Sequence, residues 1–496
     1  MEHTTPIRTR PGLTALLAFT LSLTCFGQVG NAAEDIGSTP GMTYQSNDAI
    51  FAGETDDPYR LALRAYIWGY PLVKAAAIRM AHTNPDDPYV ERAQPSAAGP
   101  LNTLNHSREL FGPEFRNGVG VNHDTLYSFG WFDLEDEAWV LEAPDFGDRY
   151  YTFSIYNADS SSADTIGQRT HGSQLPTVLI HGPLYDGPVP DDMLAIGIAT
   201  RYLNFAGRIL TSGTEEDYRI VHSLQDRIRM RPLDSYLAGK PAPASVPDQT
   251  RLSAGVESAS HYLQLYAQLG NVLRDWIPAA EEQSLLRSFE EIGLSAQAFH
   301  IEGLENATLD AMKRAARDAS ELIARRSRDL GSNHNGWTIN YLGSRFGTDY
   351  LLRAAVARDQ IYVTVPEEAI YPITRLDANG EPLHGDQHYR ISLPADALPP
   401  VKGFWSITLY NDSGYLVENP IGRYTIGDRT PGLVSGDDGT IDIRIQRDAP
   451  DTSAVNWLPA PAGEFYLMMR LYIPERAILE REWLPPPVMP VDHTEE

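Results

Sequence analysis

Cysteine is nearly absent from this chain of 496 residues, and the single one is Cys25. It lies in an apolar run, residues 13–26, which follows a short basic stretch and is too short to span a bilayer. Small residues at positions 30 and 32 then suit a signal peptidase. We therefore expect a signal peptide cleaved near Ala32 and a periplasmic or secreted mature protein. Since cleavage removes the cysteine, we expect no disulfide, no thiolate catalysis and no redox chemistry.

Basic residues are also scarce. The 40 lysines and arginines are outnumbered by 66 acidic residues, which gives a formal net charge of -26. Such a surface repels phosphate backbones and anionic lipids, so we expect no nucleic-acid partner and no membrane binding after signal cleavage. Only four of the basic residues are lysines, so nearly every basic contact is a planar guanidinium, which suits carboxylates. No later run is long and apolar enough to predict a transmembrane helix.

Familiar catalytic motifs are missing as well. The sequence has no Gly-x-Ser-x-Gly elbow, no His-Glu-x-x-His, no Gly-x-x-x-x-Gly-Lys and no complete Gly-x-Gly-x-x-Gly. The usual sequence support for an esterase, a zinc protease, a nucleotide hydrolase or a Rossmann dehydrogenase is therefore lacking. His384 and His388 have the spacing of a metal-binding pair on a strand, but we interpret them as part of a solvated polar loop. We expect no metal and no other cofactor.

What the chain does contain is the composition of a folded protein, with 42% hydrophobic and 21% charged residues and more length than one core needs. Asp57 and Pro58 predict a helix start, and Pro71 is expected to kink or end that helix. Short β runs, a helical stretch and further β runs follow, so we expect a mainly β fold with α. The predicted divisions are a signal peptide (1–32), a linker (33–56), a helix plus β-sandwich (57–214), a helical region (215–335) and a second β-sandwich (336–496).

Several motifs resemble a known family. They are VNHDTLYSFGWFDL from Val121, RYYTFSIYN from Arg149, GFWSITLYN from Gly403 and NWLPAP from Asn456. They are similar to the paired bacterial domains of unknown function 1254 (DUF1254, amino-terminal) and 1214 (DUF1214, carboxy-terminal), over nearly the whole chain after the linker. The resemblance implies an amino-terminal immunoglobulin-like β-sandwich, a helical part and a carboxy-terminal jelly-roll-like β-sandwich. It implies no established common activity.

Two of these motifs are also similar to each other. Tyr156-Asn157 and Tyr410-Asn411 both follow an alternating predicted strand that begins with two aromatic residues. A distant duplication or a chance match would explain the similarity. A duplication would place a Tyr-Asn pair at equivalent strand ends of both β-sandwiches.

The pair His123-Asp124 stands where the chain enters a predicted strand. The resemblance implies that the position of His123 is variable in the family, whereas Asp124 and Tyr127 match its motif. Asp124 could tie down the strand entrance by bonding nearby backbone donors. Alternatively, its carboxylate could act as a general acid or base beside Tyr127. Asp124 and Tyr127 are therefore the candidate catalytic residues, and both interpretations of Asp124 stay open.

Other polar and aromatic side chains in strands and family-like motifs could bind a substrate. Trp457, for example, could stack on a sugar ring or plug one end of the second β-sandwich. The candidate substrate-binding residues are Tyr151, Asn157, Arg208, Arg345, Trp405, Tyr410, Asn411, Arg423 and Trp457.

Two functions of different class agree with these features. The first is an exported non-redox enzyme, a hydrolase or lyase, that acts on a carbohydrate or small organic molecule in a cleft between the two β-sandwiches. The alternative is a non-catalytic binding protein for a sugar or hydrophobic small molecule. The expected partner is a small-molecule or carbohydrate ligand, with a homo-oligomer also possible. The fold cannot choose between these functions, because β-sandwiches host both.

Overall fold

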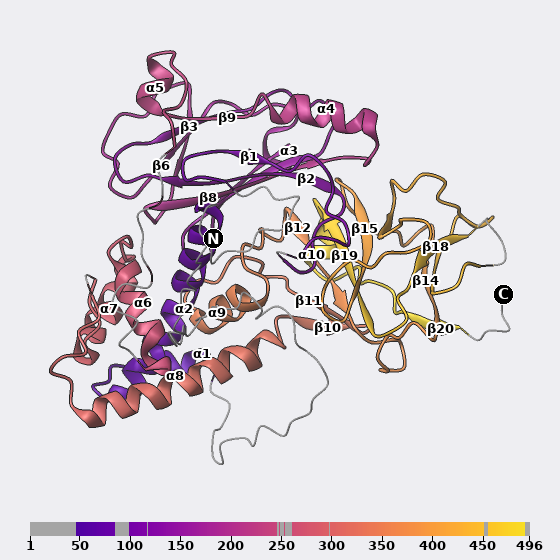
Figure 1. Ribbon diagram of the computed structural model, residues 1–496. Coiled ribbons are helices and arrows are strands. Elements are labelled where there is room, and N and C mark those ends of the chain that lie inside the picture. Colours follow the sequence, from indigo (N-terminus) through magenta and orange to yellow (C-terminus); the bar gives the residue numbers. More distant parts are fainter. Residues whose placement is uncertain are drawn as a thin grey trace, which may run out of the picture.

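The computed structural model describes residues 46–84, 99–116, 118–245, 248, 252, 260–296, 298–450 and 455–491. Two β units and a group of helices make up the fold, which is mainly β with α, as the sequence predicted (Figure 1). The predicted signal peptide and most of the predicted linker lie outside the described residues. Across the described ranges, no helix is long and apolar enough to cross a membrane.

The first β unit consists of two sheets, with strand orders β1-β2-β8-β4-β5 and β7-β6-β3-β9. The strands are β1 (Asn105–His106), β2 (Thr125–Asp133), β3 (Trp139–Glu142), β4 (Tyr151–Tyr156), β5 (Ser162–Gly167), β6 (Val178–His181), β7 (Leu194–Gly197), β8 (Tyr202–Leu210) and β9 (Arg229–Pro232). Alternate residues of each strand point to one face, and the two apolar faces enclose a core that includes Leu126, Phe205 and Ile180. Because β9 pairs with β3, this unit extends beyond the predicted boundary at residue 214. Its short helices are α3 (Gln168–His171), α4 (Glu215–Gln225) and α5 (Leu233–Leu237).

The helical part packs around α2 (Pro58–Thr83). Its other helices are α1 (Asn47–Phe51), α6 (Gln264–Leu273), α7 (Gln283–Ser288), α8 (Asn306–Ser327) and α9 (Tyr350–Asp359). Asp57 caps α2 by accepting a hydrogen bond from the Tyr59 N–H at 3.2 Å, which confirms the predicted helix start. Of the two effects expected of Pro71, an end of the helix is wrong, because α2 continues for three more turns. Residues on both sides of Pro71, including Trp68 and Leu72, are buried against the other helices, and this packing outweighs the missing backbone donor.

The second β unit also consists of two sheets whose apolar faces pack together. One sheet has the order β10-β11-β13-β19-β15-β16, with β12 also paired to β19, and the other has the order β18-β17-β14-β20. The strands are β10 (Ser332–His334), β11 (Trp337–Ile339), β12 (Ala369–Ile370), β13 (Ile373–Thr374), β14 (His388–Leu393), β15 (Trp405–Asn411), β16 (Thr425–Gly427), β17 (Ile441–Gln446), β18 (Asn456–Pro459), β19 (Phe465–Tyr472) and β20 (Met489–Val491). A short helix, α10 (Arg476–Leu479), follows β19. Each β unit is therefore a β-sandwich.

One sheet of each β unit has the same arrangement of four strands. The order β2-β8-β4-β5 in the first unit corresponds to β12-β19-β15-β16 in the second. The registers agree too: Thr152 lies opposite Arg208 and Gly167, and Ser406 lies opposite Arg470 and Gly427. Both similar Tyr-Asn motifs therefore fall at equivalent places, at the ends of β4 and β15.

The equivalent strands β5 and β16 share a second stretch of sequence. Residues 165–172 read TIGQRTHG, and residues 425–432 read TIGDRTPG. In both, the glycine N–H donates to the hydroxyl of the following threonine at 2.9 Å, from Gly167 to Thr170 and from Gly427 to Thr430. Matching strand order, register, sequence and turn geometry favour an internal duplication over a chance match.

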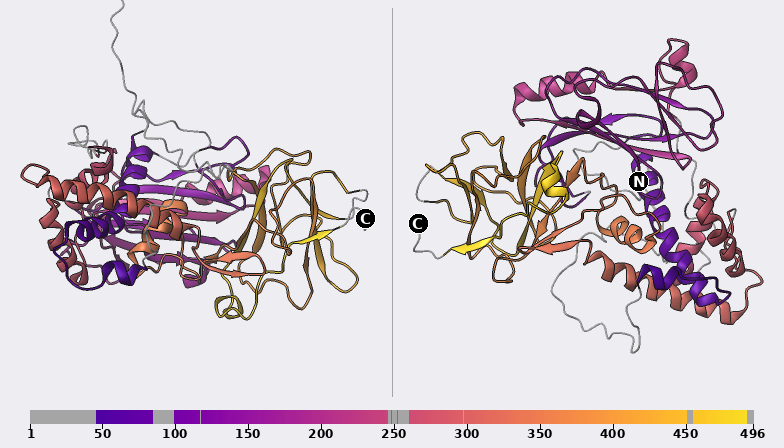
Figure 2. Two further views of the ribbon diagram at one scale, coloured as in Figure 1. Left: turned by 90° about the horizontal axis from the view of Figure 1, so that it is seen from below. Right: turned by 180° about the vertical axis from the view of Figure 1, so that it is seen from behind.

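The two β units lie next to each other, with the helical part to one side (Figures 1 and 2). Their contact includes Tyr150 and Phe404, whose rings meet edge to face with centroids 5.4 Å apart. These residues immediately precede the equivalent strands β4 and β15, so the same position of each repeat contacts its counterpart. Such a contact is typical of a two-fold interface, in which the same surface is used by both sides.

Candidate functional site

Reciprocal ion pairs connect the repeats across this interface. Arg169, in the one-turn helix α3 that follows β5, binds Glu368 of the second unit at 2.8 Å. Arg429, in the equivalent turn after β16, binds Asp124 of the first unit at 3.2 Å. The two acidic residues are themselves equivalent, because each immediately precedes its strand, β2 or β12. The interface is therefore approximately two-fold in its charged contacts as well.

Both buried carboxylates also accept a hydrogen bond from a hydroxyl. Tyr150 donates to Glu368 at 2.7 Å, and Ser406 donates to Asp124 at 2.8 Å. The turn into β2 is held by Asn122, whose side-chain oxygen accepts the N–H groups of Asp124 at 2.6 Å and Thr125 at 3.1 Å. Asp124 therefore connects the two β units, and its contacts support the structural interpretation more than the catalytic one.

Arg208 lies near the middle of the same sheet face that meets the second unit. Its register partners on the neighbouring strands are Tyr127 and Thr152, and its guanidinium lies 5.4 Å from the centre of the Tyr127 ring. Burial acts to lower the pKa of Arg208, but nearby tyrosines outweigh it and raise the pKa, so the guanidinium is charged. The tyrosines in question are Tyr127, Tyr371, Tyr156 and Tyr472. Tyr371 belongs to the second unit, where its place two residues after the start of β12 matches that of Tyr127 in β2.

This arginine has no carboxylate partner within 4 Å among the described residues, and its Nη1 atom is buried without a hydrogen bond. Other polar groups on the face are also buried without a hydrogen bond. They are Thr125 Oγ1, Thr152 Oγ1, the Tyr156 hydroxyl and both side-chain amide atoms of Asn204, together with the hydroxyl of Tyr362, which packs against the face. Strand alternation places all five sheet residues, Arg208 included, on one side of the sheet. Buried polar groups in folded proteins are nearly always bonded, so such a concentration indicates a site for a polar ligand or ordered water.

Tyr371 and Tyr156 are hydrogen-bond donors at neutral pH. Burial raises the pKa of Tyr371 to about 12, although Arg208 acts to lower it. Burial likewise raises the pKa of Tyr156, against opposing effects of Arg208 and Ser154. Tyr156 thus lies close to both, but no hydrogen bond of normal geometry joins its hydroxyl to either. A charged guanidinium surrounded by neutral hydroxyls favours an acidic ligand.

Tyr362 adds local strain to the site. Its backbone φ is 62°, in the left-handed region that bulky residues rarely adopt. Its ring packs against Trp131 and Tyr156, with centroid distances of 5.8 and 5.2 Å. A strained backbone of this kind costs on the order of 1–3 kcal/mol and is concentrated at functional sites.

Of the predicted site residues, Tyr127 and Arg208 are brought together, as register partners on β2 and β8. Tyr151 and Trp405 are not part of the site. They point to the opposite faces of their sheets and lie in the two hydrophobic cores, where Tyr151 stacks on Phe146 at 3.8 Å. The pattern of an aromatic pair did not reveal which of the two residues faces inward, because alternate strand positions point to opposite faces.

The predicted Tyr-Asn pairs have largely structural contacts. Asn157 and Asn411 each form a tight turn, in which the asparagine N–H donates to the carbonyl oxygen four residues later at 2.9 Å. Tyr410 is fully buried and donates to the backbone carbonyl of Val121 at 2.5 Å. The turns formed by the asparagines therefore explain why the motif recurs. Neither asparagine lies on the Arg208 face.

The remaining predicted residues have other contacts. Arg345 is an exposed residue that pairs with Glu367 at 2.6 Å. Arg423 donates to the Trp457 carbonyl at 2.9 Å, and both line a cavity of about 620 Å³ at the second unit. Trp457 is itself buried and donates to the Gln446 carbonyl. These contacts favour a ring that fills one end of the β-sandwich over a ring that stacks on a ligand.

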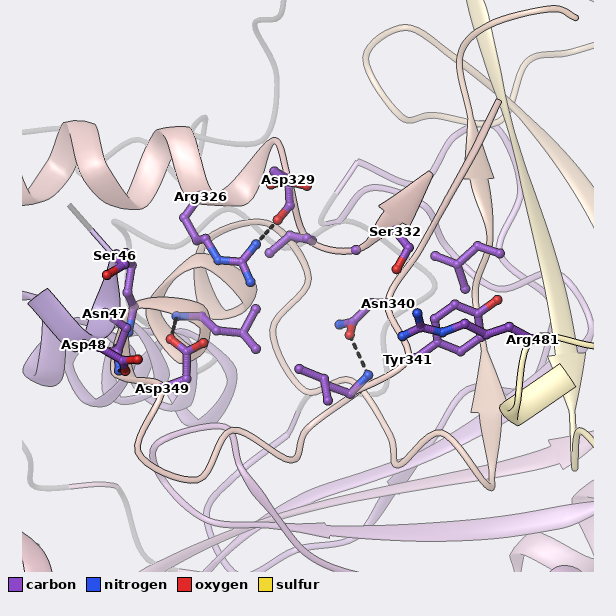
Figure 3. A pocket seen from close by; sticks show the side chains of 16 residues that line it. Ser46, Asn47, Asp48, Arg326, Asp329, Ser332, Asn340, Tyr341, Asp349 and Arg481 are labelled. Carbon is purple, nitrogen blue, oxygen red and sulfur yellow. Dashed lines mark hydrogen bonds between the residues drawn. The ribbon is translucent and has the colours of Figure 1, made fainter. Parts of the chain in front are cut away.

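A further pocket of about 480 Å³ lies between α1, the end of α8, the strands β10 and β11, and the start of α9 (Figure 3). Its polar side chains are largely bonded to nearby backbone: Arg326 to the Asp329 carbonyl, and Asp349 to the Leu352 N–H. Arg481 stacks over Tyr341 at 4.7 Å. None of the predicted site residues lines this pocket. It has the space for a ligand but lacks the unsatisfied donors that mark the Arg208 face.

The described residues include no group of three metal-ligating side chains. Of the two histidines considered from sequence, His384 precedes the start of β14 and accepts the Asp386 N–H at 3.2 Å, and His388 begins that strand.

Several residues of the site were not found from sequence, namely Thr152, Tyr156 as a ligand donor, Asn204, Tyr362 and Tyr371. One usable signal was present. Aligning TIGQRTHG with TIGDRTPG together with the Tyr-Asn motifs defines the repeat, and the repeat makes Arg208 and Arg470 equivalent.

Fold and site define a protein of two related β-sandwiches and a helical part, with a buried arginine and tyrosine cluster between the sandwiches. Residues 101–232 match the family model DUF1254 and residues 368–476 match the model DUF1214, each described as a protein of unknown function. The chain thus contains the paired DUF1254 and DUF1214 domains.

Solved structures with a similar fold include the VPA0106 protein from Vibrio parahaemolyticus. It is 22% identical, with a TM-score of 0.67 over 88% of this chain and 100% of that chain. An uncharacterised protein from Burkholderia cenocepacia is 13% identical, with a TM-score of 0.40 over 88% of this chain and 99% of that chain. No curated protein matches the chain. The similarity to the Vibrio protein concerns the fold alone.

Proposed function

We propose that this protein binds a small organic acid between its two β units, with the acid group on Arg208. The observation that carries the proposal is the charged guanidinium of Arg208, whose buried Nη1 has no partner among the described residues. A buried charge without a partner is strongly unfavourable, so a bound anion would relieve that penalty. A carboxylate fits best, because its two oxygens match the planar guanidinium.

The other unsatisfied groups of the face indicate further polar atoms on the ligand. Thr152 can donate or accept, and the Asn204 amide can do both at once. A carboxylic acid with additional hydroxyl or carbonyl groups would use these atoms, whereas a purely apolar acid would leave them unpaired. Sugar acids and hydroxy acids belong to this class. The ligand class expected from sequence, a carbohydrate or small organic molecule, is thereby restricted to acids.

A second candidate is a hydrolase or lyase acting on such an acid. One observation favours it: Tyr127 and Tyr371 are both close enough to Arg208 to influence its pKa. An arginine that neutralises a carboxylate beside tyrosine hydroxyls is suited to proton transfer near that carboxylate. Turnover of a bound acid by the wild-type protein, lost in Tyr371→Phe with binding retained, would support catalysis.

The proposal includes an exported protein with an immunoglobulin-like first unit and a jelly-roll-like second unit. The predicted signal peptide supports export, and the two-sheet packing of each unit supports the finer fold assignments. Intact-mass measurement of protein secreted or released from the periplasm checks export, with a new terminus expected near Ala33. An intact amino terminus would contradict it.

A thermal-shift screen of the purified mature protein tests the binding function. The screen compares sugar acids, hydroxy acids and aromatic acids with their uncharged amides at equal ionic strength. We expect one or more acids, but not their amides, to raise the Tm, because a ligand bound only to the folded state must stabilise it. Isothermal titration of each hit then gives its Kd.

The matched variants are Arg208→Met and Arg345→Met. Both remove an arginine, but Arg345 lies exposed and is paired with Glu367. Binding should be lost in Arg208→Met and unchanged in Arg345→Met, while Arg208→Lys should retain weak binding. If no acid stabilises the protein, or if Arg208→Met binds as tightly as the wild type, the proposal is wrong.

A further inference from the structure

The second repeat shows what its own arginine binds. Arg470, the equivalent of Arg208, is buried and donates to the carbonyl oxygens of Gly120 at 2.9 Å and Val121 at 3.3 Å. It also donates to Thr408 and to the Tyr410 hydroxyl, both at 2.7 Å. Tyr410 in turn donates to the Val121 carbonyl at 2.5 Å. One acceptor oxygen, that of Val121, is therefore held jointly by an arginine and a tyrosine.

The first repeat has the same donors. Register makes Arg208 equivalent to Arg470, because Thr152 lies opposite the first and Ser406 opposite the second. Tyr156 and Tyr410 are equivalent too, because each stands four residues after that opposite residue. Yet no carbonyl among the described residues accepts from Arg208 Nη1 or from the Tyr156 hydroxyl. The donor pair is present in both repeats, but only the second has its acceptor supplied by the chain.

The reason lies in the segment that precedes each first strand. Gly120 and Val121 stand just before Asp124, and their counterparts, at the same distance before Glu368, are Thr364 and Val365. The Val365 carbonyl accepts the N–H groups of Glu368 and Ala369 instead, at 3.0 and 3.2 Å. The Thr364 side chain lies 3.5 Å from the hydroxyl of Ser154, and Ser154 is the equivalent of Thr408. Among the described residues, no backbone oxygen accepts a hydrogen bond from Arg208 Nη1.

We infer that a carboxylate oxygen of the ligand takes the place at Arg208 and Tyr156 that the Val121 carbonyl takes at Arg470 and Tyr410. This inference rests on the proposed function and specifies the recognition of the ligand. One oxygen accepts from both the Arg208 guanidinium and the Tyr156 hydroxyl. Tyr156 packs against Tyr362 and belongs to a cluster with Trp131. The part of the acid next to this carboxylate oxygen therefore lies against aromatic rings. The structure thus favours an acid with a flat or apolar portion next to its carboxylate.

The test uses formate, the smallest carboxylate, with chloride at equal ionic strength as the reference anion, and then the acids found in the screen. The variants are Tyr156→Phe and Tyr410→Phe, which remove the same hydroxyl from the two repeats. We expect Tyr156→Phe to weaken acid binding about tenfold or more while the Tm without ligand stays close to that of the wild type. Tyr410→Phe should lower the Tm, because the buried Val121 carbonyl and Arg470 lose a partner, and should leave the affinity of the folded protein unchanged.

A double-mutant cycle of Arg208→Lys, which should retain weak binding, and Tyr156→Phe measures whether both side chains bind the same oxygen. The two effects should be strongly non-additive, since either change alone disrupts one shared interaction. If Arg208→Met abolishes binding but Tyr156→Phe leaves it unchanged, or if the two effects simply add, the inference is overturned and the proposed function stands. If neither formate nor any acid binds the wild type, both fail.

Discussion

Both carboxylate oxygens of Asp124 are engaged across the interface, one by Ser406 and the other by Arg429. Asp124→Asn keeps the shape of the side chain but removes its charge. We expect a loss of about 2 kcal/mol in the free energy of unfolding, the typical contribution of a hydrogen bond to a charged group. Acid binding per folded molecule should stay unchanged, since Asp124 lies outside the Arg208 and Tyr156 pair. Urea unfolding and titration calorimetry measure the two quantities.

Asp136, which is exposed on the loop after β2, provides the control. Asp136→Asn should leave the free energy of unfolding nearly unchanged. If Asp124→Asn instead abolished turnover of a bound acid at unchanged stability, Asp124 would be catalytic, and the structural interpretation would be wrong.

His106 is a residue whose titration should be visible in stability. Burial, and then the charge of nearby Arg108, lower its pKa from 6.5 to about 4. Between these values the unfolded chain takes up a proton that the folded protein does not, so stability is lost as the pH falls from 6.5 towards 4. At pH 5 this loss reaches at most about 2 kcal/mol.

Replacing the histidine checks this assignment. In His106→Gln, the difference in unfolding free energy between pH 7 and pH 5 should shrink by about that amount, as urea unfolding at the two pH values would show. His261 is exposed and serves as the control, so His261→Gln should keep the wild-type difference. An unchanged difference in His106→Gln would show that His106 does not titrate as proposed.

At the scale of elements, local patterns predicted most strands and helices but not their partners. The β-branched and aromatic runs around Tyr127, Tyr156 and Tyr410 indicated β2, β4 and β15, because alternation is a local property of the chain. The boundary at residue 214 failed because β9 is a short strand that completes its sheet only by pairing with β3. Pro71 does not end α2 for a similar reason, since tertiary packing outweighed a local rule.

The site was less predictable than the elements that carry it. Tyr127 and Arg208 were both candidates from sequence, but only the pairing of β2 with β8 makes them neighbours. Tyr371 comes from the other β unit, and nothing in its local sequence indicates a position next to Arg208. Register between distant strands, and the difference between one repeat and the other, decide which polar groups remain without a partner. Neither property is encoded in a short motif.

At the scale of the whole molecule, the ligand site and the reciprocal ion pairs belong to the same interface. Arg169 and Arg429 each bind a buried carboxylate of the opposite β unit, with Glu368 and Asp124 side chains only 0% and 4% exposed. Removing both arginines leaves two buried charges without their partners, which is costly. The units hold the Arg208 face between them, so their alignment should affect ligand binding even though neither arginine touches the ligand.

We therefore expect the double variant Arg169→Met and Arg429→Met to unfold at a lower temperature, with a broadened or split calorimetric transition as the two β units lose their coupling. Acid binding should weaken, and the ligand should restore part of the lost cooperativity because its proposed site lies between the two units. The control removes two exposed arginines, Arg345→Met and Arg447→Met, and should unfold like the wild type. A single sharp transition at the wild-type Tm in the double variant would show that the ion pairs do not hold the units together. Their placement in equivalent turns would then reflect the duplication alone.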